Sequence, residues 1–227
     1  MQAYDVLLFD LDGTLTDSAP GIMNCLSHAL GKMGYDMPEK PERFLGPPLY
    51  RSFAEYCGMN EEQVNEAVKL FRERYSTKGL FENSIYDGIP EMLRELRAGG
   101  KRLMVATSKA RVYAEQILEH FGIAEYFEFV GGAELGGTRN EKCEVIEYVL
   151  ASAGITDRSS VLMIGDRYND VAGARKTGLK CMGVLWGYGS EEELRQAGAD
   201  FIAETPHTLT DMLIGKELYY VRKQTII

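Results

Sequence analysis

Residues Val6–Thr14 read VLLFDLDGT, a run of four apolar residues followed at once by two aspartates and a glycine. Four consecutive apolar residues predict a short strand that is buried on both faces. In open α/β sheets ligands bind just beyond the carboxyl ends of the strands, so Asp10 and Asp12 are candidate site residues. Gly13 allows the backbone to turn tightly, and we therefore expect both carboxylates to share one site.

Further apolar runs of the same kind continue along the chain, at Leu103–Ala106, Phe127–Val130, Val161–Ile164, Met182–Trp186 and Phe201–Ala203. Between these runs, apolar residues recur every three or four positions, which is typical of helices with one apolar face. This alternation predicts an α/β fold with a Rossmann-like parallel sheet and helices on both sides.

Residues 18–84 interrupt the alternation. Helical patterns are expected from Ser18 to about Gly34 and from about Glu61 to Tyr75, separated by a proline-rich passage, and no strand is expected there. We therefore predict a helical cap at residues 18–84, inserted into a core of residues 1–17 and 85–227. The linkers are expected near Thr16–Ala19 and Asn83–Gly88.

The composition is that of an ordinary globular chain. The 227 residues are 45% apolar and 26% charged, enough for a core without disulfides. The net charge of −9 disfavours nucleic acid as a partner. Apolar runs are too short to cross a membrane, no leader is evident, and the four cysteines form no CxxC pair, so a cytoplasmic location is expected. The tail from Leu218 is expected to be either an edge strand or a partner contact.

Two later strand ends also carry polar groups, Thr107-Ser108-Lys109 and the GDRYND stretch of residues 165–170. Two carboxylates held close together raise one another's pKa, so one can act ionised and the other as a protonated acid. Several carboxylates without histidine or cysteine suit Mg²⁺ rather than zinc. The sequence therefore predicts a magnesium site at this edge of the sheet.

The series DLDGT, a hydroxyl-bearing strand end, a later lysine and GDxxxD resembles the haloacid dehalogenase superfamily, in its phosphatase branch with a helical cap. The resemblance implies that Asp10 attacks phosphorus to form an aspartyl-phosphate and that Asp12 exchanges protons with the leaving group and with water. Thr107 would hold a phosphoryl oxygen. The third motif offers two cations, of which Lys142 fits the family pattern best.

The same resemblance implies a metal site formed by the Asp10 carboxylate, the main-chain carbonyl of Asp12 and Asp166, with Asp170 in or beside the ligand shell. Asp170 could instead orient Asp166 or cap a helix. Ser108 and Arg51 are the candidate substrate contacts, Arg51 because it follows a proline-rich cap loop, Gly46–Tyr50, that could equally be ordinary surface.

The expected activity is Mg²⁺-dependent hydrolysis of a small phosphate ester, with phosphoglycolate as the best candidate and a 5'-nucleotidase or pyrophosphatase as alternatives. A phosphorelay receiver needs no helical insertion, and a non-catalytic binding module would be expected to lose Asp10 or Asp12. Both of these other classes are therefore less consistent with the sequence. Monomer and homodimer are both compatible with it.

Overall fold

The centre of the molecule is a parallel six-stranded sheet, found within residues 4–135 and 138–215, the part of the chain that this computed structural model describes. In spatial order its strands are β5 (Phe129–Ala133), β4 (Arg102–Ala110), β1 (Val6–Phe9), β6 (Val161–Gly165), β7 (Lys180–Val184) and β8 (Phe201–Ala203). The predicted α/β fold with a parallel sheet is confirmed. The first strand lies in the middle, between β4 and β6, so the DLDGT segment emerges at the centre of the sheet edge.

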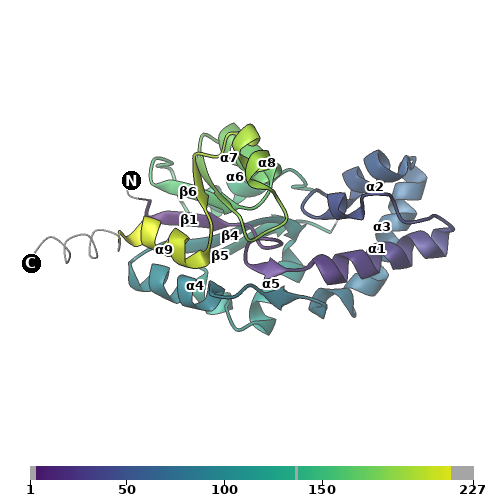
Figure 1. The fold of residues 1–227 in the computed structure, drawn as a ribbon, viewed down its shortest axis with the longest axis horizontal. Helices are drawn as coiled ribbons and strands as arrows, with labels where there is room; N and C mark the ends of the chain where they lie inside the picture. Colours follow the sequence, from purple (N-terminus) through teal and green to yellow (C-terminus); the bar gives the residue numbers. More distant parts are fainter. Residues whose placement is uncertain (1–3, 136–137, 216–227) are drawn as a thin grey trace, which may run out of the picture.

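Helices cover both faces of this sheet (Figure 1). One face packs against α4 (Ile89–Ala98), α5 (Arg111–His120) and α9 (Pro206–Ile214), and the other against α6 (Lys142–Ser152), α7 (Tyr168–Lys176) and α8 (Glu191–Ala197). Alternate residues of β1 serve the two faces: Leu7 and Phe9 belong to the first hydrophobic cluster, and Val6 and Leu8 to the second. This two-sided burial explains why the strand reads as a continuous apolar run.

The insertion folds into three helices, α1 (Ala19–Met33), α2 (Leu49–Cys57) and α3 (Glu61–Tyr75), which lie beside the sheet in Figure 1. The expected helices at both ends of the insertion are confirmed. Asn60 caps the N-terminus of α3, because its side chain accepts from the Gln63 amide. Helix α2 was not predicted. Its nine residues follow directly on Pro48, and prolines in this passage suggested a loop although proline is also common at helix starts.

The two linkers pair with one another. Strand β2 (Thr16–Asp17) runs antiparallel to β3 (Ser84–Ile85), with Thr16 opposite Ile85. No strand was expected in residues 18–84, so β3 is a correction. Its partner lies nearly seventy residues away, and two residues carry no periodicity that a local pattern could reveal. The division into residues 1–17 with 85–227 and residues 18–84 stays a prediction.

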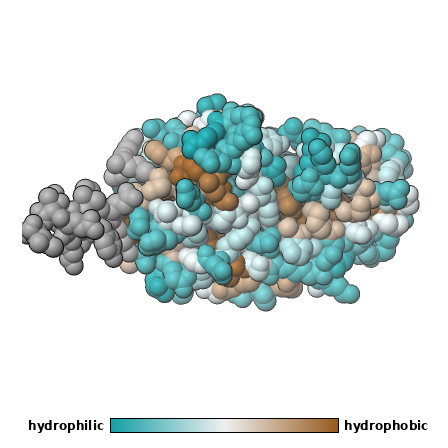
Figure 2. Space-filling model, in the orientation of Figure 1, coloured by the Kyte–Doolittle hydropathy of each residue, from teal (hydrophilic) through white to brown (hydrophobic). Residues whose placement is uncertain are grey.

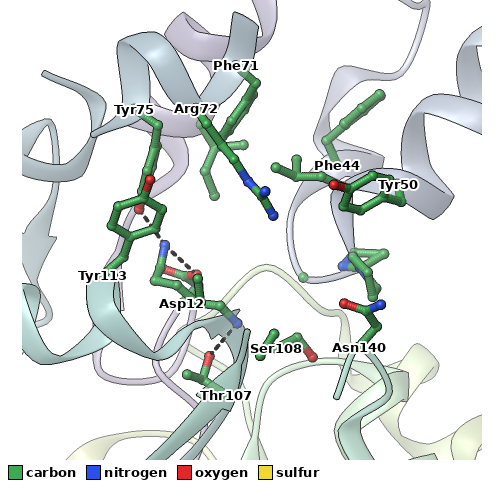
Figure 3. Close-up of a pocket in the computed structure, with 18 of the residues that line it drawn as sticks. Asp12, Phe44, Tyr50, Phe71, Arg72, Tyr75, Thr107, Ser108, Tyr113 and Asn140 are labelled. Atoms are coloured by element: carbon green, nitrogen blue, oxygen red, sulfur yellow. Dashed lines mark hydrogen bonds and ion pairs between the residues drawn. The ribbon is translucent and has the colours of Figure 1, made fainter. Parts of the chain in front are cut away.

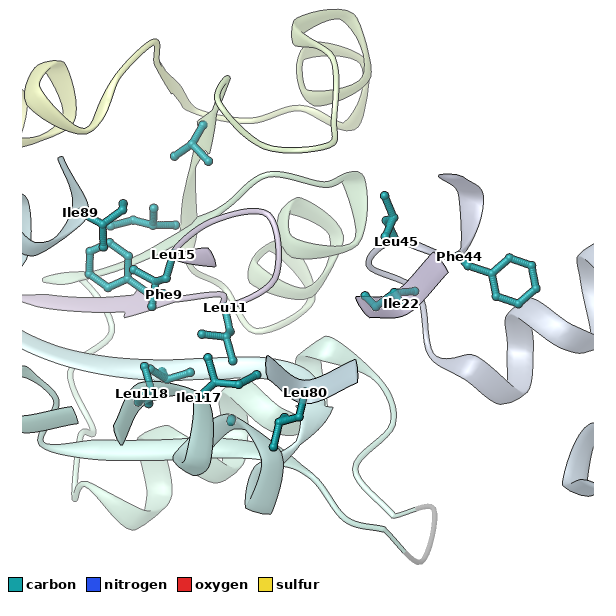
Figure 4. Close-up of a cluster of buried hydrophobic side chains, with 14 of the residues drawn as sticks. Phe9, Leu11, Leu15, Ile22, Phe44, Leu45, Leu80, Ile89, Ile117 and Leu118 are labelled. Carbon is teal, nitrogen blue, oxygen red and sulfur yellow. The ribbon is translucent and has the colours of Figure 1, made fainter. Parts of the chain in front are cut away.

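Buried side chains connect the cap with the core. Figure 4 shows Phe9, Leu11 and Leu15 of the core in the same hydrophobic cluster as Ile22 and Leu45 of the insertion. The visible surface in Figure 2 is mainly hydrophilic, with apolar residues in small groups. Among the described residues, no helix is long and apolar enough to span a bilayer. The expectations for the tail from Leu218 fall outside the described residues.

Candidate active site

Three strand ends bring the expected polar residues to one edge of the sheet. Asp10 follows β1, Thr107 lies in the last part of β4, and Asp166 follows β6. All three are almost completely buried, with exposed fractions of 4%, 1% and 0%. The Leu11 amide donates a hydrogen bond of 2.7 Å to Asp10 Oδ1, which fixes the orientation of the carboxylate. Buried carboxylates need partners of this kind, because an unpaired buried charge is costly.

Lys142 supplies the principal cation beside Asp10. Its Nζ lies 2.9 Å from Asp10 Oδ1 and 2.8 Å from Asp170 Oδ1, and it donates a 3.0 Å hydrogen bond to the Ala106 carbonyl. Burial alone would lower the pKa of Lys142, but the two carboxylates outweigh it and the pKa is raised, so the ammonium stays charged. The other cation of this segment, Arg139, pairs instead with Glu134.

Asp10, Asp166 and Asp170 form a buried acidic cluster. One carboxylate oxygen from each lies within 4.8 Å of those of the others. Burial, followed by the charges of Asp170 and Asp10, raises the pKa of Asp166 well above its usual range. Burial also raises the pKa of Asp170, to about 6, although Lys142 opposes the shift. Three buried hard oxygen donors, whose repulsion Lys142 offsets only in part, fit a hard divalent cation.

Asp166 is held in place from two sides. The amide of Tyr188 donates to Oδ2 at 2.8 Å, and the hydroxyl of Thr14 donates to Oδ1 at 3.2 Å. Gly13 is also essential to this arrangement, since its φ of 81° is in the left-handed region and a side chain there would collide with Asp166. The DGT part of the first motif therefore shapes the acidic cluster as well as turning the chain.

Asp170 takes part in two contacts. Its Oδ2 accepts the Arg167 amide at 3.1 Å, in the first turn of α7, while its Oδ1 lies against Lys142. It thus caps a helix and pairs with the lysine, and it also lies within the acidic cluster. That Asp170 binds the metal directly stays a prediction.

Asp12 has a partner that the sequence analysis did not assign. Lys109 Nζ lies 2.8 Å from Asp12 Oδ2 and also donates to the hydroxyl of Tyr75 (Figure 3). Lys109 was noted only as a cation beside the Thr107-Ser108 hydroxyl pair. The signal that could have identified it is its position on β4, which extends to Ala110 and carries the lysine past the strand end expected at Ala106.

Above these residues lies a cavity walled by the cap (Figure 3). Asp12, Thr107 and Ser108 line its floor, and Asn140 lines one side. Asp10 also lines the cavity. The wall opposite the floor is largely aromatic and comprises Phe44, Tyr50, Phe71 and Tyr75 from the insertion together with Tyr113 from α5.

One arginine reaches into this cavity, and it is not the expected one. Arg72 on α3 points into the space, donates to the Leu135 carbonyl at 2.8 Å and lies 5.6 Å from the centre of the Tyr50 ring. Arg51 does not line this cavity; it is half exposed, pairs with Glu55 along α2 at 2.8 Å and lines a neighbouring cavity together with Ser108 and Lys142. The expected Arg51 contact stays a prediction, and Arg72 is a further candidate for a substrate contact. Helix α2 presents Tyr50 to this cavity and Arg51 to the neighbouring one.

The sequence model of "Haloacid dehalogenase-like hydrolase" matches residues 7–184 of the chain. A 5'-nucleotidase from Pseudomonas aeruginosa is 46% identical, over 85% of this chain and 87% of its own length. Tyrosine-protein kinase PtkA from Mycobacterium tuberculosis is 41% identical, over 92% of this chain and 68% of its own. A phosphoglycolate phosphatase from Vibrio parahaemolyticus is 27% identical, over 93% of this chain and 97% of its own length.

Similarity in three dimensions agrees with these matches. The crystal structure of a predicted phosphatase from Clostridium acetobutylicum superposes with a TM-score of 0.91 at 42% identity, over 94% of this chain and all of that one. The family match extends from β1 to β7 and includes the inserted cap. The chain belongs to the haloacid dehalogenase-like hydrolase family, and it is one of the phosphatases of that family.

Proposed function

We propose that the protein is a Mg²⁺-dependent phosphomonoesterase that acts on a nucleoside monophosphate through an aspartyl-phosphate intermediate. The observation that carries this proposal is the shape of the site: a buried aspartate paired with lysine opens into a cavity whose opposite wall is aromatic. The acidic floor supports the reaction class, and the aromatic wall supports the class of substrate.

The reaction divides into two displacements at phosphorus. In the first, a carboxylate oxygen of Asp10 bonds to phosphorus while the ester P–O bond breaks, and the departing oxygen takes a proton from Asp12. In the second, water bonds to phosphorus and gives a proton to Asp12 while the Asp10–phosphorus link breaks. Phosphate leaves, and both aspartates return to their initial protonation states.

The phosphoryl group carries negative charge that the site must offset before an aspartate can approach it. Lys142 lies against the nucleophile, and Thr107 and Ser108 line the floor of the cavity where phosphoryl oxygens would lie. Asp10, Asp166 and Asp170 would hold Mg²⁺ together with the Asp12 carbonyl. The ion would supply further positive charge to the phosphoryl oxygens when bound.

The cap favours a nucleotide over phosphoglycolate. A phosphoglycolate molecule has no apolar surface to place against Phe44, Tyr50 and Phe71, whereas a nucleobase stacks on aromatic rings at about 1–3 kcal/mol per base. Arg72 beside Tyr50 adds a planar cation that suits a base or a sugar hydroxyl. The relative named 5'-nucleotidase is also considerably more similar in sequence than the phosphoglycolate phosphatase.

The test is phosphate release from a panel of esters at equal concentrations with Mg²⁺. The panel contains nucleoside monophosphates, phosphoglycolate, sugar phosphates, pyrophosphate and a folded phosphoprotein, with Asp10→Asn as the control. Preference for nucleoside monophosphates that this variant loses would support the proposal. Preference for phosphoglycolate or pyrophosphate would keep the reaction and replace the substrate, and release from no ester would overturn both.

A further inference from the structure

The ammonium group of Lys109 connects the cap to the acid–base residue Asp12. It lies 2.8 Å from Asp12 Oδ2 and donates a hydrogen bond to the hydroxyl of Tyr75. Lys109 belongs to β4 in the core, whereas Tyr75 is the last residue of α3 in the cap. In Figure 3 the dashed lines run from Tyr75 through this lysine to Asp12. The contact therefore exists only while the cap lies against the core as it does here.

Tyr75 is rigidly placed for this contact. Its side chain is 3% exposed, its ring stacks on Phe71 at 5.5 Å and meets the edge of Tyr113 at 5.3 Å. Burial raises the pKa of Tyr75 to about 12, so the hydroxyl is protonated near neutral pH and accepts from Lys109 as a neutral group. Two ring contacts and one hydrogen bond fix the position of the hydroxyl.

The carboxyl of Asp12 is held by one oxygen only. Lys109 contacts Oδ2, while Oδ1 is buried and has no hydrogen-bond partner among the described residues. Buried carboxylate oxygens without a partner are rare, because they lose their hydration without compensation. Asp12 lines the cavity, so its carboxyl group lies beside the space that a reacting group would enter.

We propose that Tyr75 is a positioning residue that holds Lys109 against Asp12 and so aligns the free Asp12 oxygen for proton transfer when the cap is closed. This inference rests on the proposed phosphomonoesterase function. As the ester P–O bond breaks, the proton passes from Asp12 to the departing oxygen, and water later returns one to Asp12. When the cap moves away, the hydroxyl leaves Lys109 and the carboxyl loses its alignment.

The test compares two esters of nearly the same shape, phenyl phosphate and 4-nitrophenyl phosphate. The nitro group stabilises the departing phenolate, so that ester needs little help from an acid, whereas phenyl phosphate needs protonation of its leaving oxygen. The quantity to measure is kcat/KM, because this parameter reports on the steps up to and including the first irreversible one, in which the leaving oxygen departs. Tyr75→Phe is the informative variant because it keeps the ring and removes only the hydroxyl.

For Tyr75→Phe we expect kcat/KM to fall about tenfold with phenyl phosphate and by less than about twofold with the nitro ester. The tenfold loss is smaller than the full contribution of a general acid, which is about 10²–10⁴-fold. Lys109→Met should show the same selective loss, and Lys109→Arg should restore part of it. Tyr35→Phe is the matched control, because it removes another cap hydroxyl, one that accepts from Gln63 outside the cavity. Tyr35→Phe should leave kcat/KM unchanged for both esters.

Equal losses with both esters in Tyr75→Phe would overturn the inference, because they would mark a purely structural role. Unchanged values with both would overturn it as well. Failure of the proposed function is a separate result: the unmodified protein would release no phosphate from nucleoside monophosphates, or Asp10→Asn would remain active. Circular dichroism and thermal melts of each variant ensure that folded proteins are being compared.

Discussion

Gly13 lies directly against the carboxylate of Asp166: a β-carbon at position 13 would be 2.2 Å from Asp166 Oδ2. No side chain fits there unless the carboxylate moves out of the acidic cluster. The DLDGT motif and the GDRYND stretch of residues 165–170 are thus complementary in shape, although about 150 residues of sequence separate them.

This contact predicts the effect of Gly13→Ala. The variant should lose at least about a hundredfold in kcat/KM, since displacement of a site group by 1 Å can cost that much. Gly34→Ala is the matched control. Gly34 also has a positive φ, of 75°, but nothing lies within 4 Å of its β-position, so the control should lose about 1–2 kcal/mol of stability and keep its activity. Comparable losses of activity in both variants would contradict the prediction.

Asp10→Asn should lower kcat at least about a thousandfold, because it removes the proposed nucleophile while keeping the size of the side chain. The fold should persist, since Lys142 keeps its ion pair with Asp170. Phosphate release measures the activity, and circular dichroism measures the fold. Retained turnover in a folded Asp10→Asn protein would rule out the covalent mechanism.

The acidic cluster predicts that Mg²⁺ stabilises the protein more at high pH. The pKa values of Asp166 and Asp170 are raised, so without metal their contribution to stability is present below about pH 4 and is lost as pH rises, for Asp170 through about 6. Mg²⁺ would bind the ionised form and offset the repulsion. At a hundredfold excess over Kd, we expect Tm to rise by about 5–10 °C at about pH 7.5 and by clearly less at about pH 5.

Thermal melts in EDTA and in Mg²⁺ check this pH dependence, with sodium chloride at equal ionic strength as the control for screening. An equal rise in Tm at both pH values would show that the cation acts elsewhere than at these carboxyls.

Neighbouring residues on α2 distinguish the cavity from the surface. Tyr50→Leu removes an aromatic wall and should raise KM for a nucleoside monophosphate about tenfold, while KM for phosphoglycolate should change little. Arg51→Leu should leave both KM values unchanged, because Arg51 pairs with Glu55 outside the cavity. A rise in KM for Arg51→Leu alone would support the contact that the sequence suggested.

The central sheet was predictable because strands that are buried on both faces appear in the sequence as continuous apolar runs. A strand such as β1 must be apolar at every position, and the residue that follows it must meet the ligand edge. The grouping of Asp10, Asp166 and Lys142 therefore followed from strand ends and motif order. Their catalytic and metal-binding roles stay predictions that the variants above test.

The cap was less predictable, because its contacts with the core are made by single side chains far apart in sequence. Nothing local to Tyr75 marks it as the partner of Lys109, and Arg72 and Arg51 look alike until the directions of two helices are known. The Asp12–Lys109 pair was missed because β4 extends past the strand end expected at Ala106. The proposed substrate preference rests on these cap residues, which explains why the reaction class was easier to infer than the substrate.

The antiparallel pairing of Thr16–Asp17 with Ser84–Ile85 has a consequence for how such a protein can vary. Because the outgoing and returning segments are in register, a residue added to or removed from one would shift its pairing with the other and tilt the cap over the aspartates. Between those two segments no such constraint applies. Helices of the cap can therefore change in length and lining, and thereby in the ester that they admit, while the attachment keeps the reaction centre in place.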